Sequence, residues 1–329
     1  MKKVIPLGMV ALSALFLSAC TQKNSAAAKE TFISDLVQMN STKNNRQETQ
    51  LLVNRFSVSG DKHSSLQTLK GTSLDLTVKR DSAQHTLNLS GSATFDQIPY
   101  PIDLTLSQKG IYVSSADLKQ IYNHIKPTLA QEFGPYAGLY GGMFNHLKAP
   151  YLFVGQSVLD SGRSQKSNEK WAETFKSLLE PAVASKDQLK KAYQHLSNDP
   201  FSQKGDEATL SVTEKNISFS ELIKKIPSFS TQVNEDQLKD LIKASKDTTI
   251  KTVTIVSTIN GKTNQLKTKI SGDVIDTKSK EGEINFAVTT RSKTSSSNQA
   301  ITEPDSSNVI SLEQLQQDTF SDVTKDTNT

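Results

Sequence analysis

The single cysteine of this 329-residue chain, Cys20, ends an N-terminal segment with the layout of an export signal. Met1-Lys2-Lys3 is positively charged, and residues 4–17 form an apolar run without a charged residue. That run is too short to span a bilayer, and a basic start followed by a short apolar stretch and small residues is typical of a secretory signal. One cysteine also excludes a disulfide framework within the chain.

Leu17-Ser18-Ala19-Cys20 resembles the lipobox of bacterial lipoproteins, in which leucine and two small residues precede the modified cysteine. The resemblance implies transfer of a diacylglyceryl group to the Cys20 sulfur and cleavage before it, which makes residues 1–19 a signal peptide. An ordinary cleaved signal with a chance cysteine is the alternative. Two acyl chains hold a protein stably on a bilayer where one does not. We therefore expect a protein anchored through Cys20 on the extracytoplasmic face of the cell membrane.

Charge predicts little about other partners. Removal of residues 1–19 takes away Lys2 and Lys3 and no acidic residue, so the mature chain would carry 36 basic and 34 acidic residues, a net charge of +2. Net charge alone therefore predicts no strong attraction to anionic lipid head groups. The basic residues form no patch along the sequence, which argues against nucleic-acid binding. Protein partners are not indicated, and residues 20–29, small and polar, are expected to form a flexible tether.

The sequence offers no catalytic constellation. Ser59-Gly60-Asp61-Lys62 and Ser167-Asn168-Glu169-Lys170 both fit the S-x-x-K pattern of penicillin-recognising enzymes, but a chain rich in serine and lysine gives such matches by chance, and no K-T-G follows. The chain has no G-x-S-x-G, H-E-x-x-H, P-loop or G-x-G-x-x-G sequence. The five histidines lie far apart, so neither a metal site nor a cofactor is expected. We predict that the protein is not an enzyme.

The first and last thirds of the chain alternate apolar and polar residues with a period of two, which predicts antiparallel strands with one apolar face. Asn260-Gly261, between two of these segments, predicts a two-residue type I′ hairpin turn. The expected strands cover residues 56–58, 73–79, 87–95, 102–107, 111–113, 248–259, 266–275 and 283–291, with two shorter ones at 151–154 and 208–213.

The middle of the chain has helical spacing. One apolar stripe on residues 118–125 is expected to end at Pro127. From Ser321 onward the polar composition predicts a disordered tail. The expected helices cover residues 30–39, 115–147, 169–179, 186–196, 218–226 and 235–244.

The order of strands, helices and strands predicts an α+β fold. We expect one strongly curved antiparallel sheet, an incomplete barrel begun by the first strands and completed by the last, with helices covering its concave apolar face. The predicted organisation is a signal peptide (1–19), the lipidated cysteine and tether (20–29), a single domain (30–320) and a disordered tail (321–329).

Residues 133–147 (FGPYAGLYGGMFNHL) combine aromatic residues with glycines. On a helix, five large side chains of this segment fall on one face: Tyr136, Tyr140, Met143, Phe144 and Leu147. The first four of these form a candidate lid over a hydrophobic cavity. The alternative is a helix packed on the sheet, with the glycines permitting close approach.

The lipobox, polar tether, strands, covering helices and final strands together resemble the LolA/LppX/LprG-like lipoprotein group over about residues 50–315. The resemblance implies a bent sheet that holds a lipid beneath helices. Phe153, Trp171 and Glu303-Pro304-Asp305 stand where related Gram-positive lipoproteins have similar residues, and we interpret them as packing positions. A composition rich in lysine, asparagine and serine suits a Gram-positive source.

We therefore expect a membrane-anchored lipoprotein that binds or carries a lipid or another hydrophobic molecule. The alternatives are a non-catalytic interaction or structural envelope lipoprotein with a filled core, and a hydrolase of cell-wall or lipid substrates. The candidate cavity lining is the apolar face of the predicted strands: Leu74, Leu76, Val78, Leu87, Leu89, Phe95, Leu104, Ile270, Phe286 and Val288.

Overall fold

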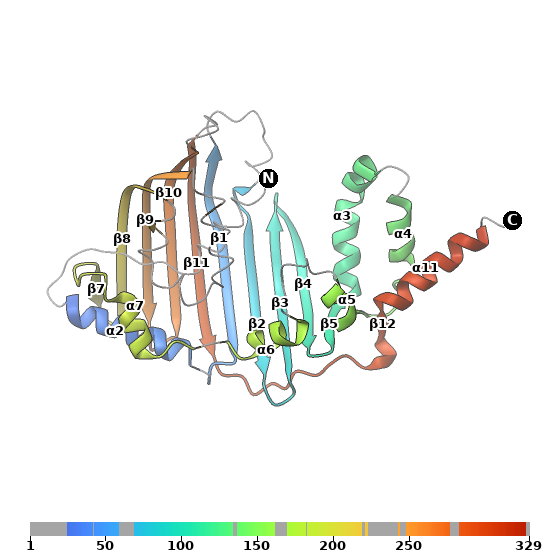
Figure 1. Ribbon diagram of the computed structural model, residues 1–329, viewed down its shortest axis with the longest axis horizontal. Coiled ribbons are helices and arrows are strands. Elements are labelled where there is room, and N and C mark those ends of the chain that lie inside the picture. The colour runs from blue at the N-terminus through green and yellow to red at the C-terminus, as the bar shows by residue number, and fades with distance from the viewer. Residues whose placement is uncertain are drawn as a thin grey trace. The chain divides into compact units, whose positions relative to one another are not determined.

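The structure, a computed structural model, contains a 12-stranded, mostly antiparallel sheet and seven α-helices among the residues that it describes (Figure 1). The sheet does not close on itself, and its strand order is β12-β6-β5-β4-β3-β2-β1-β11-β10-β9-β8-β7. The predicted α+β class is therefore confirmed. The described residues are 25–41, 43–58, 69–133, 137–161, 170–181, 183–218, 221–222, 243, 248–276 and 283–326.

Contacts between Cα atoms divide the chain into two compact units. The first unit comprises residues 1–75, 94–98 and 183–296, and the second comprises residues 76–93, 99–182 and 297–329. Each unit contains hydrophobic clusters of its own. The single domain over 30–320 stays a prediction.

The first unit contains the longest strands, and its two outermost sequence segments pair with each other. β1 (Arg46–Val58) runs antiparallel to β11 (Glu283–Ser295), from Arg46 opposite Ser295 to Val58 opposite Ile284. Early and late strands therefore share one sheet, as predicted. Beyond β11 follow β10 (Gln265–Asp276), β9 (Thr248–Asn260), β8 (Glu207–Ser218) and β7 (Phe201–Lys204).

The hairpin between β9 and β10 is confirmed, but its predicted type I′ turn is wrong. Asn260 pairs with Gln265, which leaves a four-residue loop, residues 261–264. Within this loop Asn264 has the positive φ of 49°, and the Asn260 side chain accepts a hydrogen bond from the Thr263 backbone N–H. The loop is also held from outside, because the backbone N–H of Gly261 donates to the carboxylate of Asp35.

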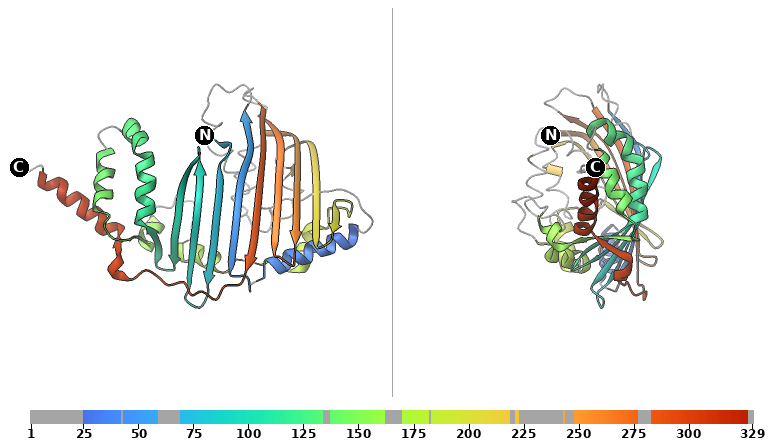
Figure 2. Two further views of the ribbon diagram at one scale, coloured as in Figure 1. Left: turned by 180° about the vertical axis from the view of Figure 1, so that it is seen from behind. Right: turned by 90° about the vertical axis from the view of Figure 1, so that its right-hand side faces the viewer.

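Two helices of the first unit, α2 (Ser25–Met39) and α7 (Lys186–Tyr193), contact each other, and α2 packs against strands β7, β8 and β9 (Figure 2). α2 buries Phe32 and Ile33 in a cluster with Phe201 of β7, Leu210 of β8 and Ile259 of β9. α7 adds its Tyr193 ring, whose centroid lies 6.1 Å from that of Phe32. Burial of these rings is what holds α2 on the strands.

This packing corrects the predicted tether. Residues 25–29 belong to α2, where Ala28 is only 1% exposed and the Lys29 ammonium donates to the Leu196 carbonyl oxygen over 2.6 Å. Small and polar residues suggest flexibility, but alanine is also the best helix former, so a packed helix can begin here. Of the expected tether, residues 20–24 lie outside the described residues.

The second unit contains the shorter strands. β5 (Gly110–Ser114) pairs antiparallel with β6 (Tyr151–Gly155), and β12 (Val309–Ser311) lies parallel to β6. The remaining strands, most of whose residues belong to this unit, are β2 (Ser73–Asp81), β3 (Thr86–Phe95) and β4 (Ile98–Ser107).

The helices of the second unit differ from expectation at two points. The helices are α3 (Ser115–Phe133), α4 (Ala137–His146), α5 (Gln156–Ser161), α6 (Trp171–Leu179) and α11 (Leu312–Asp326), with a 3₁₀ turn at Ser306–Asn308. Pro127 lies inside α3 and does not end it. Proline cannot donate to the carbonyl four residues before it, but residues 123–127 are exposed, so water can satisfy that group.

Residues 321–326, predicted to be disordered, continue α11. The preceding turns of α11 are packed along one face. Leu315 is 2% and Thr319 3% exposed, and the Thr319 hydroxyl donates to the Leu315 carbonyl oxygen. Polar composition alone does not reveal such a sparse buried stripe. The predicted helices at 218–226 and 235–244 lie almost entirely outside the described residues.

Candidate functional site

The predicted cavity lining divides between two hydrophobic clusters. Ile270, Phe286 and Val288 belong to a cluster of the first unit, and Leu74 packs against it. Leu87 belongs to a cluster of the second unit formed with Leu106, Trp171, Phe175 and Leu179; Val78, Leu89 and Leu104 pack against that cluster. Leu76 is half-buried, and Phe95 is 48% exposed.

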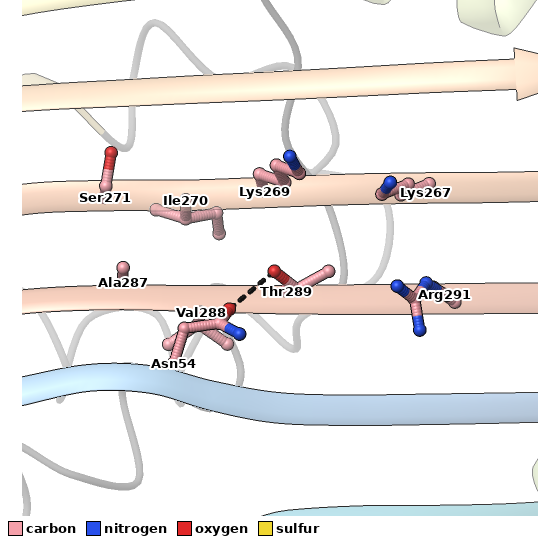
Figure 3. Close-up of a pocket in the computed structure, with 9 residues that line it drawn as sticks. All are labelled: Asn54, Lys267, Lys269, Ile270, Ser271, Ala287, Val288, Thr289 and Arg291. Atoms are coloured by element: carbon pink, nitrogen blue, oxygen red, sulfur yellow. Dashed lines mark hydrogen bonds between the residues drawn. The ribbon is translucent and has the colours of Figure 1, made fainter. Parts of the chain in front are cut away.

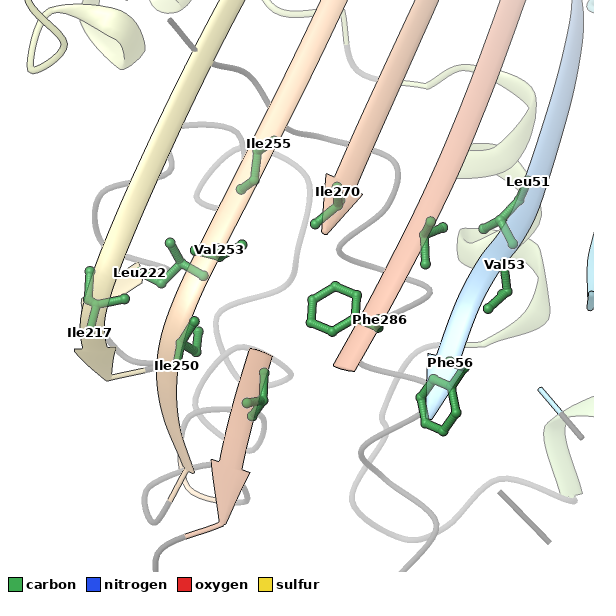
Figure 4. Close-up of a cluster of buried hydrophobic side chains, with 12 residues drawn as sticks. Leu51, Val53, Phe56, Ile217, Leu222, Ile250, Val253, Ile255, Ile270 and Phe286 are labelled. Atoms are coloured by element: carbon green, nitrogen blue, oxygen red, sulfur yellow. The ribbon is translucent and has the colours of Figure 1, made fainter. Parts of the chain in front are cut away.

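In the first unit, the apolar side chains form ordered rows across the strands (Figure 4). We call Val53, Val288, Ile270, Ile255 and Val212 the aliphatic row, because each lies opposite the next on the neighbouring strand, from β1 to β8. A second row of the same face joins Phe56, Phe286, Gly272 and Val253. The period of two places all of them on one face of the sheet.

A third row introduces hydroxyl groups into this face. Ser257, Thr268 and Thr290 lie opposite one another on β9, β10 and β11, and they are 0%, 1% and 6% exposed. We call these three the hydroxyl row; Leu210 and Leu51 flank it on β8 and β1. The Ser257 Oγ and the Thr268 Oγ1 are 2.6 Å apart and share a hydrogen bond, which satisfies part of the demand of two buried hydroxyls.

The described part of the candidate lid packs into the second unit. Met143 and Phe144 contact a cluster centred on Leu147, and the Phe144 ring stacks on Tyr122 with centroids 4.1 Å apart. This contact is the arrangement expected of a packed helix. Tyr136 and the side chain of Tyr140 lie outside the described residues, as does Cys20, so the lid and the lipid anchor stay predictions.

The three positions interpreted as packing residues do pack. The Trp171 indole N–H donates to the Ser107 carbonyl oxygen over 2.9 Å, and the Phe153 ring lies 4.8 Å from that of Tyr112. Glu303 accepts hydrogen bonds from the Lys109 ammonium (2.7 Å) and the Tyr112 hydroxyl (3.1 Å). Burial, followed by the charge of Glu303, raises the pKa of Tyr112 to about 12. Tyr112 therefore stays protonated and acts as a structural hydrogen-bond donor to Glu303.

The opposite face of the first unit carries a shallow depression of about 370 Å³ (Figure 3). Ser271 and Ala287 lie opposite each other at one end of it, and the cationic side chains follow along the same two strands toward the other end: Lys269, Lys267 and Arg291. These residues are not among the candidate site residues expected from the sequence. The signal was present in part, because residues 267 and 269 share one face of a strand, but the register that adds Arg291 is not visible in the sequence.

Among the described residues, no group of histidine, cysteine, aspartate and glutamate side chains is arranged to hold a metal ion. None of the helices seen in that part of the chain is both long and apolar enough to cross a bilayer. No protein-family model matches the chain, and no curated protein is significantly similar to it in sequence.

Proposed function

We propose that the protein is an extracytoplasmic lipoprotein, anchored through acylated Cys20, that binds a lipid or another hydrophobic molecule on the apolar face of the first unit. We further propose that the sheet is strongly curved, that the apolar face is its concave face, and that helices cover it. The bound molecule lies along the aliphatic row and the row that contains Phe286.

The observation that supports the proposal is the continuity of this apolar face. Five adjacent strands contribute to it, and β1, β9 and β11 are each 13 residues long. At about 3.3 Å per residue such a strand extends for roughly 40 Å, which exceeds the length needed for an acyl chain. Ligand sites for apolar molecules are lined mainly by hydrophobic side chains with a few polar groups, and the hydroxyl row supplies such groups here.

The alternative function is an interaction or structural lipoprotein with a filled core. Its support is the extent of burial: Ile255 and Ile270 are 3% exposed, and Phe286 and Val288 are 7% exposed, so the chain itself covers them. A hydrophobic site that the protein already fills has no room for a ligand. The two functions therefore make opposite predictions for a substitution that adds volume to the face.

Ile255→Trp tests the proposal, with Thr254→Trp as the matched control on the same strand but the opposite face. In a ligand site, the added ring should weaken the binding of a fluorescent fatty acid at least tenfold and leave the thermal midpoint nearly unchanged. In a filled core, the ring would overpack and destabilise the protein by typically 1–3 kcal/mol. A wild-type protein that binds no probe, together with a strongly destabilised Ile255→Trp variant, would establish the filled-core alternative.

The anchor is tested separately by feeding cells with labelled palmitate. The wild-type chain should incorporate the label, and the Cys20→Ala variant should not, because Cys20 is the only cysteine of the chain. Label on the Cys20→Ala variant would disprove the proposed anchor without bearing on the apolar face. Native mass spectrometry of the detergent-extracted protein should then reveal a co-purified lipid beyond the covalent one.

A further inference from the structure

We infer that the depression formed by Lys267, Lys269 and Arg291 binds the phosphate groups of anionic phospholipids and so holds the polar face of the first unit against the bilayer. This inference rests on the proposed membrane anchor, but not on the proposed ligand of the apolar face. It concerns residues that lie on opposite sides of the same strands from the apolar rows.

Like charges lie next to one another on β10 and β11. Lys267 of β10 lies directly opposite Arg291 of β11, and Lys269 follows two residues later on the same face. Like charges directly opposite each other on neighbouring strands destabilise a sheet. Repulsion among the three cations therefore destabilises the pairing of β10 and β11 here. Such a local cost is expected where the charges serve binding.

Three described carboxylates of β1, β10 and β11 are engaged with partners other than the cations of the depression. Glu48 lies 2.8 Å from Arg46, and Glu283 lies 2.9 Å from Lys251. Asp273 accepts a hydrogen bond from the Asn285 side chain. Neither Lys267 nor Lys269 forms an ion pair with any residue in the described ranges, and both are exposed. Within the described part of the chain, no carboxylate therefore neutralises these two ammonium groups.

Hydrogen bonds hold Arg291 in place beside the two lysines. The Arg291 guanidinium donates to the Gln50 side-chain oxygen over 2.7 Å, and Gln50 in turn donates to Asp75 over 2.8 Å, which restricts the position of the arginine. The Thr289 hydroxyl donates to Asn54 over 2.6 Å at the rim (Figure 3). A restrained guanidinium beside two lysines matches phosphate better than it matches a neutral group.

The position of the anchor favours a bilayer as the source of the phosphate. α2 begins at Ser25, and five residues of extended chain reach at most about 18 Å from Cys20. α2 packs on the apolar face, in the cluster that Leu266 joins, and its Asp35 accepts a hydrogen bond from Gly261 in the hairpin loop. Lys267 lies at the same hairpin end of the strands but on the opposite face, because successive strand residues alternate between faces. The anchored end of the chain and the depression thus belong to the same end of the same unit, and the tether reaches the bilayer around that end. Local charge acts on a membrane surface even where the net charge is nearly balanced.

The experiment uses the acylated protein in vesicles. With Cys20 acylated, a cysteine introduced by Thr254→Cys is the only one open to a fluorescent label, and it lies opposite Ser271 on the polar face. Vesicles of phosphatidylglycerol and phosphatidylcholine should quench this label through nitroxide-bearing lipids, and vesicles of phosphatidylcholine alone should not. A label introduced by Gln194→Cys, at the C-terminal end of α7, should be quenched in neither.

The decisive variant is the triple change Lys267→Gln, Lys269→Gln and Arg291→Gln, which should return the quenching at residue 254 to the level of neutral vesicles. Each basic residue near an anionic surface contributes about 1 kcal/mol to membrane binding. Loss of all three should therefore lower the equilibrium constant for docking roughly a hundredfold. The control removes three exposed cations of the same unit at other places, Lys43, Lys191 and Lys204, and should keep the quenching.

The outcomes separate the two proposals. Protein that fails to float with either kind of vesicle would contradict the anchor, whereas protein that floats without quenching at residue 254 would overturn the docking. Equal losses in both triple variants would also overturn it, because net charge would then explain the attraction. Inorganic phosphate that abolishes quenching at constant ionic strength would assign the depression to a free phosphate ligand. Lys267→Gln alone should raise the urea midpoint without lipid, which shows that the variant folds.

Discussion

Phe286 lies over Gly272 across the β10–β11 pair, and together with the Thr252 backbone oxygen of β9 it leaves no space for a Cβ atom at residue 272. A Cβ atom there would stand 3.3 Å from the nearest carbon of the Phe286 ring and 2.6 Å from the backbone oxygen of Thr252. Because a backbone atom cannot move aside as a flexible side chain does, Gly272→Ala should destabilise the protein by about 1–3 kcal/mol. The free energy of unfolding in urea measures this.

The control for this prediction is Ser271→Ala, one residue earlier and on the opposite face. Ser271 is half-buried, and its substitution should change stability by no more than about 0.5 kcal/mol. Equal stabilities of the Gly272→Ala variant and the wild type would show that the strands separate at this point, which would contradict the register of β9, β10 and β11.

The sheet could be predicted from the sequence because a period of two is a direct consequence of strand geometry. The alternation in residues 266–275 identified β10, and the uncovered apolar faces of early and late strands predicted that they share one sheet. Local signals were less reliable where tertiary contacts intervene. Asn260-Gly261 predicted a two-residue turn, whereas the loop takes four residues and is held by Asp35 of α2.

The candidate site could be predicted only in part, because sequence periodicity gives a face but not its neighbours. Ile270, Phe286 and Val288 were assigned to the apolar face and are buried together in one cluster. Leu87 has the same alternation, but its cluster is formed with Trp171 of α6, which no period-two pattern reveals. The basic depression could not be predicted for the same reason, since Lys267 and Arg291 lie opposite each other only through the register of two strands.

Asp35 should make stability depend on pH. Burial raises the pKa of its carboxyl group, and the hydrogen bond from Gly261 opposes this only in part. The folded protein therefore binds the proton more tightly than the unfolded chain, so stability should fall as the pH rises from below 3.8 through the raised pKa. Asp35→Asn, which keeps the acceptor oxygen, should be more stable than the wild type near neutral pH.

The measurement for Asp35 is urea unfolding as a function of pH. The advantage of Asp35→Asn should disappear as the pH falls below the ordinary pKa of 3.8, where both proteins carry a neutral side chain. Asp35→Ala is the control, because it removes the hydrogen bond to Gly261 together with the charge. An advantage of Asp35→Asn that is the same at all pH values would show that ionisation of Asp35 is not its cause.

Glu303 should influence the titration of Tyr112. The pKa of Tyr112 is raised to about 12 by burial first and by the charge of Glu303 second. Glu303→Gln should therefore lower the pKa of Tyr112, while leaving it above the ordinary 10 because burial remains. Absorbance titration of tyrosinate measures the shift, and the difference spectrum against Tyr112→Phe isolates this one of the seven tyrosines.

The same group predicts a loss of stability in alkali. The unfolded chain loses the Tyr112 proton near pH 10, whereas the folded protein keeps it until about pH 12. The contribution of the neutral hydroxyl is thus fully present below pH 10 and is lost as the pH rises through that window. The stability difference between the wild type and Tyr112→Phe should shrink over this range. A difference that stays constant between these pH values would contradict the raised pKa.

Trp171 should be the residue on which the cluster of the second unit most depends. Its side chain is 5% exposed, and its indole N–H donates to the Ser107 carbonyl oxygen over 2.9 Å. Trp171→Phe keeps an aromatic ring in the cluster but leaves that buried carbonyl without its donor, which costs about 1–3 kcal/mol. Circular dichroism during urea unfolding measures the loss, since the variant lacks the only tryptophan of the chain.

The control is Lys170→Ala, because Lys170 precedes α6 as its N-cap, makes no side-chain capping bond and is exposed. That substitution should change stability by no more than about 0.5 kcal/mol. In Trp171→Phe the backbone N–H of residue 171 still donates to Asp160, so the start of α6 is preserved and the loss reports on the indole. The indole does not titrate, and the loss should therefore be the same in mildly acidic and mildly alkaline solution. Wild-type stability of Trp171→Phe would mean that Ser107 finds another donor and that α6 is not fixed to β4 by this hydrogen bond.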